Sequence, residues 1–161
     1  MGVPVRRIEN IPFDQLVIGQ TASHTHQVTE EDILLFARVS GDINPIHLDE
    51  GYAKGTQFGG RIAHGMFTGA LISAGLALNL PGPGSVYLGQ TLRFRAPVRI
   101  GDILTVHMEL VDKNDKRKMV TLNCVVTNQD GVRVCTGEAT ALAPLEKIIL
   151  DTPELPPVRI G

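Results

Sequence analysis

The sequence predicts an α+β fold in which an antiparallel sheet wraps around one long buried helix. We expect the helix over residues 66–80, because this run is apolar on nearly all sides and ends at Pro81-Gly82-Pro83-Gly84. From residue 85 onward the apolar period changes to two, and turn-forming residues separate the strands. With 161 residues, 43% of them hydrophobic and 20% charged, the chain has the size and composition of one globular domain.

The ends of the chain differ from its centre, so we divide it into three parts. Residues 1–17 are expected to be an N-terminal extension, residues 18–144 the folded domain, and residues 145–161 a proline-rich tail. The pair Arg6-Arg7 is not followed by an apolar segment, so the N-terminus does not resemble a signal peptide. The apolar stretch 71–80 is too short to span a bilayer.

The charge balance limits the classes of partner. The formal net charge is −2, whereas a protein that binds nucleic acid needs a basic surface for the phosphates. We therefore expect no nucleic-acid partner, and the lack of a signal-like or membrane-spanning segment predicts a cytoplasmic protein without a membrane partner.

The first elements are a strand over residues 18–27 and a helix that begins after Thr29. Thr29 is a good N-cap, and the acidic residues that follow it suit the positive end of a helix dipole. Gly41 is typical of a helix C-terminus. The helix should therefore place Asp42 directly after its end, in a segment 42–63 that we expect to be mostly loop, with one short helix over residues 48–53.

The strands follow the long helix. One long strand is expected over residues 85–96, and hairpin turns at residues 113–116 and 128–131 separate the next strands. Alternation puts these side chains on the buried faces of two neighbouring strands: Leu104, Val106, Met108, Leu110, Val120, Leu122, Cys124 and Val126. The last strand covers residues 132–142. Cys124 and Cys135 are expected to be reduced thiols in the core.

The segment Ser40-Gly41-Asp42-Ile43-Asn44-Pro45-Ile46-His47 indicates chemistry. It places a carboxylate and an imidazole five residues apart, and together they can hold and deprotonate one water. Either residue alone would more often be structural. A second signal, His64-Gly65, puts backbone N–H groups at the start of the buried helix, where they could stabilise an oxyanion on a carbonyl.

These motifs closely resemble the MaoC-like family of (R)-specific enoyl-CoA hydratases. The resemblance runs through Phe36–His47, Phe58–Met66, Ser85–Gln90, Phe94–Val98 and Thr136–Ala139, and its Asp-x-Asn-Pro-x-His core is specific. It implies a hot-dog fold, with a long central helix wrapped by an antiparallel sheet. It also implies a homodimer or a higher assembly of dimers, an acyl-CoA or acyl-carrier-protein thioester as substrate, and neither a metal nor a cofactor.

The resemblance also assigns site residues. Asp42 and His47 would bind and activate the water, and the pattern leaves open which of them takes its proton. Asn44 would orient the loop or the water, and the Gly65 N–H would stabilise the thioester oxygen. The residues assigned to substrate binding are Ser73, His64 and Met66; a packing role for Ser73 and a turn-shaping role for His64 stay open.

Three other functions compete with hydration of an enoyl-CoA. The closest is dehydration of (R)-3-hydroxyacyl-carrier protein in fatty-acid synthesis, because Arg93, Arg95, Arg99 and residues 113–118 could meet CoA phosphates or an acidic carrier equally well. A hot-dog thioesterase would commonly carry an Asp or Glu on the central helix, and residues 66–79 contain neither. A non-catalytic domain that binds acyl thioesters would need neither Asp42 nor His47.

Overall fold

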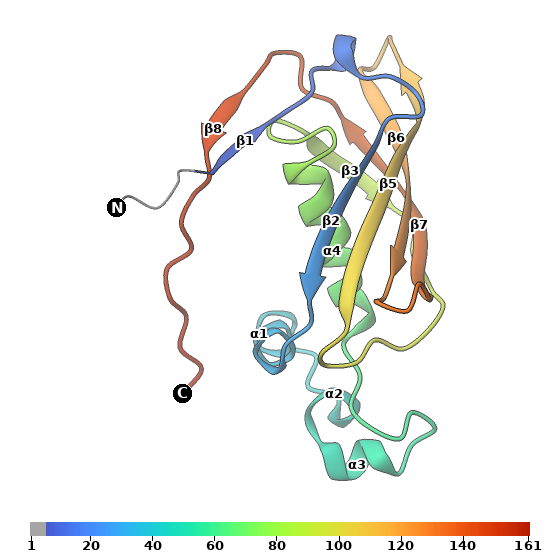
Figure 1. The fold of residues 1–161 in the computed structure, drawn as a ribbon, viewed down its shortest axis with the longest axis vertical. Coiled ribbons are helices and arrows are strands. Elements are labelled where there is room, and N and C mark those ends of the chain that lie inside the picture. The colour runs from blue at the N-terminus through green and yellow to red at the C-terminus, as the bar shows by residue number, and fades with distance from the viewer. Residues whose placement is uncertain (1–5) are drawn as a thin grey trace.

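A long helix lies inside one curved antiparallel sheet in the structure, a computed structural model that describes residues 6–161 (Figure 1). The strand order in the sheet is β2-β5-β6-β7-β3, and β4 also pairs with β7. The strands are β2 (Thr21–Gln27), β3 (Val86–Gln90), β4 (Arg93–Phe94), β5 (Ile103–Asn114), β6 (Met119–Thr127) and β7 (Arg133–Leu142). The helices are η1 (Phe13–Gln15), α1 (Glu30–Ser40), α2 (Pro45–Leu48), α3 (Glu50–Lys54) and α4 (Gly65–Leu78).

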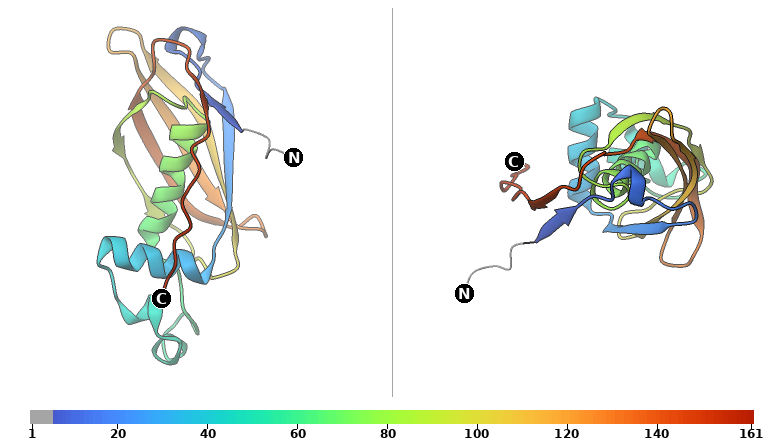
Figure 2. Two further views of the ribbon diagram at one scale, coloured as in Figure 1. Left: turned by 90° about the vertical axis from the view of Figure 1, so that its left-hand side faces the viewer. Right: turned by 90° about the horizontal axis from the view of Figure 1, so that it is seen from above.

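The sheet curls around α4, as the view from above in Figure 2 shows, and this confirms the predicted α+β layout. All eight side chains predicted to face inward from β5 and β6 are buried. The sheet approaches the helix closely at Gly75, where an added Cβ would lie 2.9 Å from the Cε of Met108. The small residues of α4 therefore allow the backbone of the helix to pack against side chains of the sheet.

The predicted strand 85–96 is wrong in its continuity, because the structure divides it into β3 and β4. Both pieces pair with the same edge of β7, because β6 occupies its other edge, and the pairing is interrupted between them at Thr91 and Leu92. An added Cβ on Gly137 would lie 1.8 Å from the Thr91 carbonyl oxygen, so this close approach of the two backbones needs glycine at position 137. The Thr91 N–H donates to the Glu138 carbonyl, which satisfies the backbone where the strand breaks.

The short helix predicted over residues 48–53 is present as α3, but the sequence patterns did not predict α2, which precedes it. The Asn44-Pro45 step begins α2. Asn44 Oδ1 accepts a hydrogen bond from the Ile46 N–H at 3.2 Å, and Pro45 occupies the first helical turn, where a missing N–H costs nothing. His47 therefore lies on a helix and not in a loop.

A two-stranded ribbon joins the two ends of the chain, and the sequence patterns did not predict it. Strand β1 (Arg7–Glu9) pairs antiparallel with β8 (Ile149–Asp151), so part of the predicted N-terminal extension lies beside part of the predicted tail. The ribbon stands away from the sheet in Figure 1, and the C-terminal residues continue past α4 in the left-hand view of Figure 2. The first five residues of the predicted extension lie outside the described part of the chain.

Two predictions about the chemistry of the fold can be compared with this structure. Among residues 6–161, no helix has both the length and the apolar character needed to cross a membrane. Cys124 and Cys135 are free and buried, as predicted. Burial raises the pKa of the Cys124 thiol to about 11, so this thiol stays protonated and unreactive at neutral pH.

Candidate active site

The end of α1 fixes the position of Asp42. Gly41 adopts a left-handed conformation with φ of 79°, which ends the helix as predicted. Ser40 Oγ donates to the Phe36 carbonyl at 2.6 Å and accepts from the Asp42 N–H at 3.2 Å. Asp42 Oδ1 in turn accepts from the Asn44 N–H at 3.1 Å, so the carboxylate is held by a short turn while its side chain stays 50% exposed.

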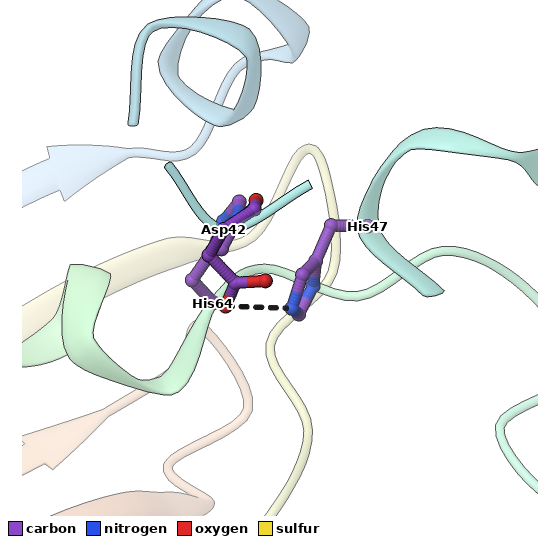
Figure 3. Close-up of side chains that lie close together, drawn as sticks. All are labelled: Asp42, His47 and His64. Carbon is purple, nitrogen blue, oxygen red and sulfur yellow. Dashed lines mark hydrogen bonds and ion pairs between the residues drawn. The ribbon is translucent and has the colours of Figure 1, made fainter. Parts of the chain in front are cut away.

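Helix α2 presents His47 to this carboxylate. The His47 Nδ1 lies 2.8 Å from the Ile62 carbonyl oxygen, and because a carbonyl can only accept, Nδ1 must carry the proton. The unprotonated Nε2 then faces Asp42 Oδ2 at 3.8 Å, as Figure 3 shows. His47 is 8% exposed, whereas Asp42 opens to solvent, so the pair combines a buried imidazole with an accessible carboxylate.

The surroundings of His47 favour its neutral form. Burial lowers the pKa of His47 below its ordinary value, and His64 lowers it further, while the bond to the Ile62 carbonyl and the charge of Asp42 act in the opposite direction. Neutral Nε2 and the Asp42 carboxylate are both acceptors. A separation of 3.8 Å suits one water that donates a hydrogen to each, with water–acceptor distances of about 2.8 Å.

Arg61 holds α2 in place, and no sequence pattern indicated this role. Its Nε donates to the His47 carbonyl at 2.6 Å, and its Nη1 donates to both carboxylate oxygens of Glu30, at 2.8 and 3.0 Å. The guanidinium thus connects the residue that carries the imidazole to the first turn of α1. The side chain of Arg61 is only 12% exposed, whereas that of Glu30 is 55% exposed, so the partly buried bond to the His47 carbonyl positions α2 more firmly than the exposed ion pair does.

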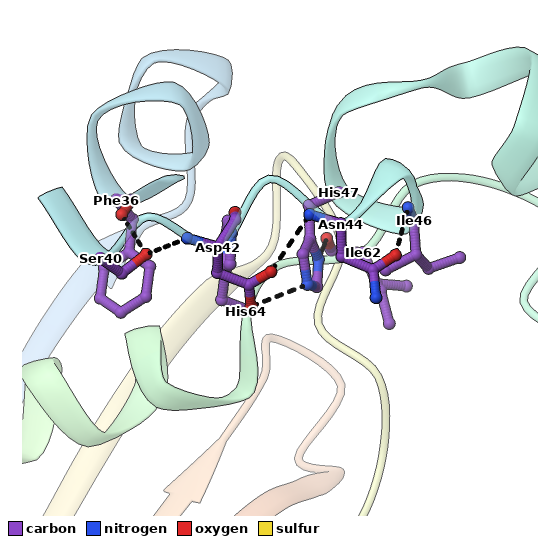
Figure 4. Close-up of polar contacts among 8 residues, drawn as sticks. All are labelled: Phe36, Ser40, Asp42, Asn44, Ile46, His47, Ile62 and His64. Atoms are coloured by element: carbon purple, nitrogen blue, oxygen red, sulfur yellow. Dashed lines mark hydrogen bonds and ion pairs between the residues drawn. The ribbon is translucent and has the colours of Figure 1, made fainter. Parts of the chain in front are cut away.

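His64 lies against the Asp42/His47 pair from the start of α4. Its Nε2 lies 2.9 Å from the backbone carbonyl oxygen of Asp42, and its ring stacks on that of His47 with centroids 3.8 Å apart (Figure 4). His64 is 2% exposed. It was predicted to bind substrate or to shape the turn, and its contacts connect it directly to both members of the pair.

A cavity of about 340 Å³ begins beside His64 and Gly65. Thr68, Phe94 and Arg95 also line it. An added Cβ on Gly65 would lie 3.0 Å from the Phe94 ring, so any side chain at this position would push that ring away. Gly65 is the first residue of α4, where backbone N–H groups have no partner within the helix. The cavity therefore has an apolar wall beside a backbone N–H group, at Gly65, that could donate to an oxyanion.

Three predicted residues occupy other positions around this cavity. Asn44 uses its side-chain carbonyl to cap α2, which agrees with a role in orienting the loop. Met66 is 59% exposed, Ser73 is partly buried, and neither is among the residues that line the cavity. Their role in substrate binding stays a prediction.

Of the basic residues expected to meet an anionic substrate, only some lie near the cavity. Arg95 is exposed on its wall. Arg99 is engaged by the Phe58 and Gly60 carbonyls, at 2.6 and 3.4 Å. The hairpin with residues 113–118 lies at the opposite end of the sheet from α2, as Figure 1 shows, so these lysines do not face the site.

The three grouped side chains do not have the geometry of a metal site. Asp42, His47 and His64 each offer an atom within 4.8 Å of the others. The two imidazoles, however, are stacked with an interplanar angle of 27°, so an ion bonded in the plane of one ring would lie outside the plane of the other. The predicted lack of a metal stays a prediction.

Comparisons with known proteins connect this site to a family. Residues 15–130 match the family described as "MaoC like domain". The chain is 47% identical over 132 residues to the 3-hydroxybutyryl-CoA dehydratase of Methylorubrum extorquens, covering 82% of this chain and 83% of the relative. It is 45% identical over 132 residues to the (R)-specific enoyl-CoA hydratase of Rhodospirillum rubrum, covering 82% of this chain and 91% of that one.

A solved structure resembles the whole described fold. The unliganded R-hydratase PhaJ1 from Pseudomonas aeruginosa superposes with a TM-score of 0.93 at 51% sequence identity, covering 97% of this chain and 100% of the other. The structural match therefore extends beyond the sheet and the central helix to nearly the full length of the chain.

Proposed function

The chain belongs to the MaoC-like domain family and is a hydro-lyase, and from this premise we propose that it is an (R)-specific enoyl-CoA hydratase. The reaction adds one water reversibly to a trans-2-enoyl-CoA and gives the (R)-3-hydroxyacyl-CoA. One observation carries the proposal: the neutral Nε2 of His47 faces the Asp42 carboxylate at 3.8 Å, a spacing that suits one bound water.

In the proposed mechanism His47 is the general base. Its lowered pKa keeps Nε2 unprotonated at neutral pH, and Asp42 holds the second hydrogen of the water. As Nε2 takes a proton, the water oxygen bonds to C3, and the electron pair of the C2=C3 double bond moves toward the thioester carbonyl. The proton then leaves the Asp42/His47 pair for C2. The sum is one water added, and both side chains return to their starting state.

The start of α4 supports the charge that develops in this step. As electrons move onto the thioester oxygen, the Gly65 N–H would donate to it, assisted by the positive end of the helix dipole. The cavity beside Gly65 is lined by apolar groups, Phe94 and Val134 among them, and would receive part of the thioester substrate.

Turnover on two matched thioesters tests the substrate class. We expect the protein to consume crotonyl-CoA, followed as loss of the enoyl-thioester absorbance, with a kcat/KM at least about tenfold above that for the crotonyl thioester of acyl carrier protein. The reason is that Arg95 offers a single cation beside the cavity, enough for a CoA phosphate but little for an extended acidic surface. A preference for the carrier-protein thioester would instead support the dehydratase of fatty-acid synthesis, and binding without turnover of either would support the non-catalytic domain.

We further propose that two copies of the chain associate through β3. This strand lies at the end of the sheet order, so its outer edge has no neighbour within the described part of the sheet. Val86 and Leu88 on it are 52% and 51% exposed. An unpaired apolar edge favours pairing with a second strand, and an antiparallel copy of the same strand can supply it.

Charge placed on this edge should break the dimer. We expect the double variant Val86→Lys/Leu88→Lys to elute as a monomer in size-exclusion chromatography with light scattering, while the unmodified protein elutes as a dimer or larger. Val132→Lys, at an apolar residue 45% exposed in the β6–β7 turn, serves as the control and should keep the native mass. A monomeric native protein would contradict the proposal, as would a dimeric double variant.

A further inference from the structure

We propose that His64 is a positioning residue for the Asp42/His47 pair, holding the Asp42 loop through a hydrogen bond and the His47 ring through stacking. The expected kinetic effects rest on the proposed hydratase function. The structural part of the inference does not, because it follows from contacts that join three separate segments of the chain: the end of α1, helix α2 and the start of α4.

The first contact fixes the loop that carries Asp42. Because the Asp42 carbonyl can only accept, His64 must donate to it from Nε2, at 2.9 Å. The bonds from Ser40 and to Asn44 that shape this loop are all local, within two residues of Asp42. The bond from His64 spans 22 residues, so it sets where the loop lies relative to the start of α4.

The second contact fixes one face of the base. The rings of His64 and His47 stack at 3.8 Å, and the Phe36 ring packs against His64 at 5.0 Å. The stack excludes solvent from the His47 face, and His64 is one of the causes that lower the pKa of His47. His47 is therefore held by its Nδ1 bond to Ile62 at its edge and by His64 on its face.

The remaining nitrogen of His64 argues against a purely structural role. Nδ1 is buried and has no hydrogen-bond partner among the described residues. Leaving a buried polar atom unpaired is unfavourable, and a phenyl ring would fill the same space without it. A phenyl ring could not, however, donate the hydrogen bond that His64 gives to the Asp42 carbonyl. The histidine at this position is therefore explained by the donor that it directs at the catalytic loop.

The position of His64 in the chain extends its influence to a third group. It directly precedes Gly65, whose N–H would stabilise the thioester oxygen. Two neighbouring titratable or charged groups contact the residues of the pair: His64 stacks on the His47 ring, and Arg61, whose guanidinium is bonded to Glu30, donates to the His47 backbone carbonyl. A movement of His64 would thus disturb the Asp42 loop, the His47 imidazole and the Gly65 N–H together.

Two variants separate the hydrogen bond from the stack. His64→Phe keeps a ring but loses the donor, and we expect kcat to fall roughly 10- to 100-fold with little change in KM, since a misplaced Asp42 impairs the reaction more than binding. His64→Gln can keep an amide donor near the Nε2 position but loses the ring. We expect it to retain more of kcat and to shift the acidic limb of kcat/KM to higher pH, because His47 becomes more solvated. His107→Gln, at an exposed histidine on β5, is the matched control and should change neither quantity.

An NMR titration of the His47 imidazole tests the inference without using activity. We expect the pKa of His47 to rise in His64→Gln and to stay at the native value in His107→Gln. The proposal would be overturned if His47 had the same pKa in the native protein and in His64→Gln. It would also be overturned if both His64 variants lost kcat only in proportion to a fall in their melting temperatures. If the native protein consumes no enoyl thioester, the hydratase proposal fails while the titration still decides the role of His64.

Discussion

Replacing His47 by Gln is expected to lower kcat for enoyl-CoA hydration by about 1,000-fold, roughly 4 kcal/mol of transition-state stabilisation. Glutamine can keep a polar contact near Ile62, but its amide cannot accept a proton from water. The native enzyme should also lose kcat/KM as the pH falls through the lowered pKa of His47, because only the neutral imidazole acts as a base. Steady-state rates on crotonyl-CoA across pH measure both effects.

The control for this variant is His107→Gln, the same substitution at an exposed histidine whose Nε2 pairs with the Thr127 hydroxyl on the sheet. It should keep the native rate. If His47→Gln retained more than about a tenth of the native kcat, His47 could not be the base, since a positioned general base contributes at least about 100-fold.

Replacing Asp42 by Asn is expected to lower kcat by about 100-fold while leaving the fold intact. The Asn side chain can still accept from the Asn44 N–H, so the turn should survive. Its amide group, however, replaces one acceptor with a donor, and the site loses the charge that holds the water and supports the protonated His47. Stopped-flow traces under single-turnover conditions would separate this chemical effect from product release.

Asp49→Asn provides the matched control for that substitution. Asp49 accepts from the Tyr52 N–H at 2.9 Å as the N-cap of α3, and asparagine caps a helix equally well. The control should therefore keep both the native rate and the melting temperature. Equal rates for Asp42→Asn and Asp49→Asn would show that the Asp42 carboxylate takes no part in the reaction.

The parts of the site that the sequence predicted depend on local signals. Thr29 and Gly41 mark the two ends of α1 by capping chemistry that involves only neighbouring residues, and this was enough to place Asp42 directly after the helix. The buried faces of β5 and β6 likewise follow from strict alternation along each strand.

What the sequence did not predict depends on contacts between distant segments. The division of residues 85–96 into two strands follows from the approach of Thr91 to Gly137. The alternation of residues along this segment does not indicate a contact so distant in the sequence. The roles of Arg61 and Phe94 depend on which carbonyl or glycine lies beside them in the fold. Helix α2 lies in a segment expected to be mostly loop for another reason: a proline after a capping asparagine can begin a helix as well as interrupt one.

The most direct test of the central claim compares three proteins on crotonyl-CoA: the native chain, Asp42→Asn and His47→Gln. Loss of the enoyl-thioester absorbance gives the rate, and chiral analysis of the product gives the face of addition. The proposed (R)-specific hydratase function predicts (R)-3-hydroxybutyryl-CoA from the native protein, and the Asp42/His47 mechanism predicts rates lower by about 100- and 1,000-fold in the two variants. Comparable rates in all three proteins, or an (S) product from the native chain, would contradict it.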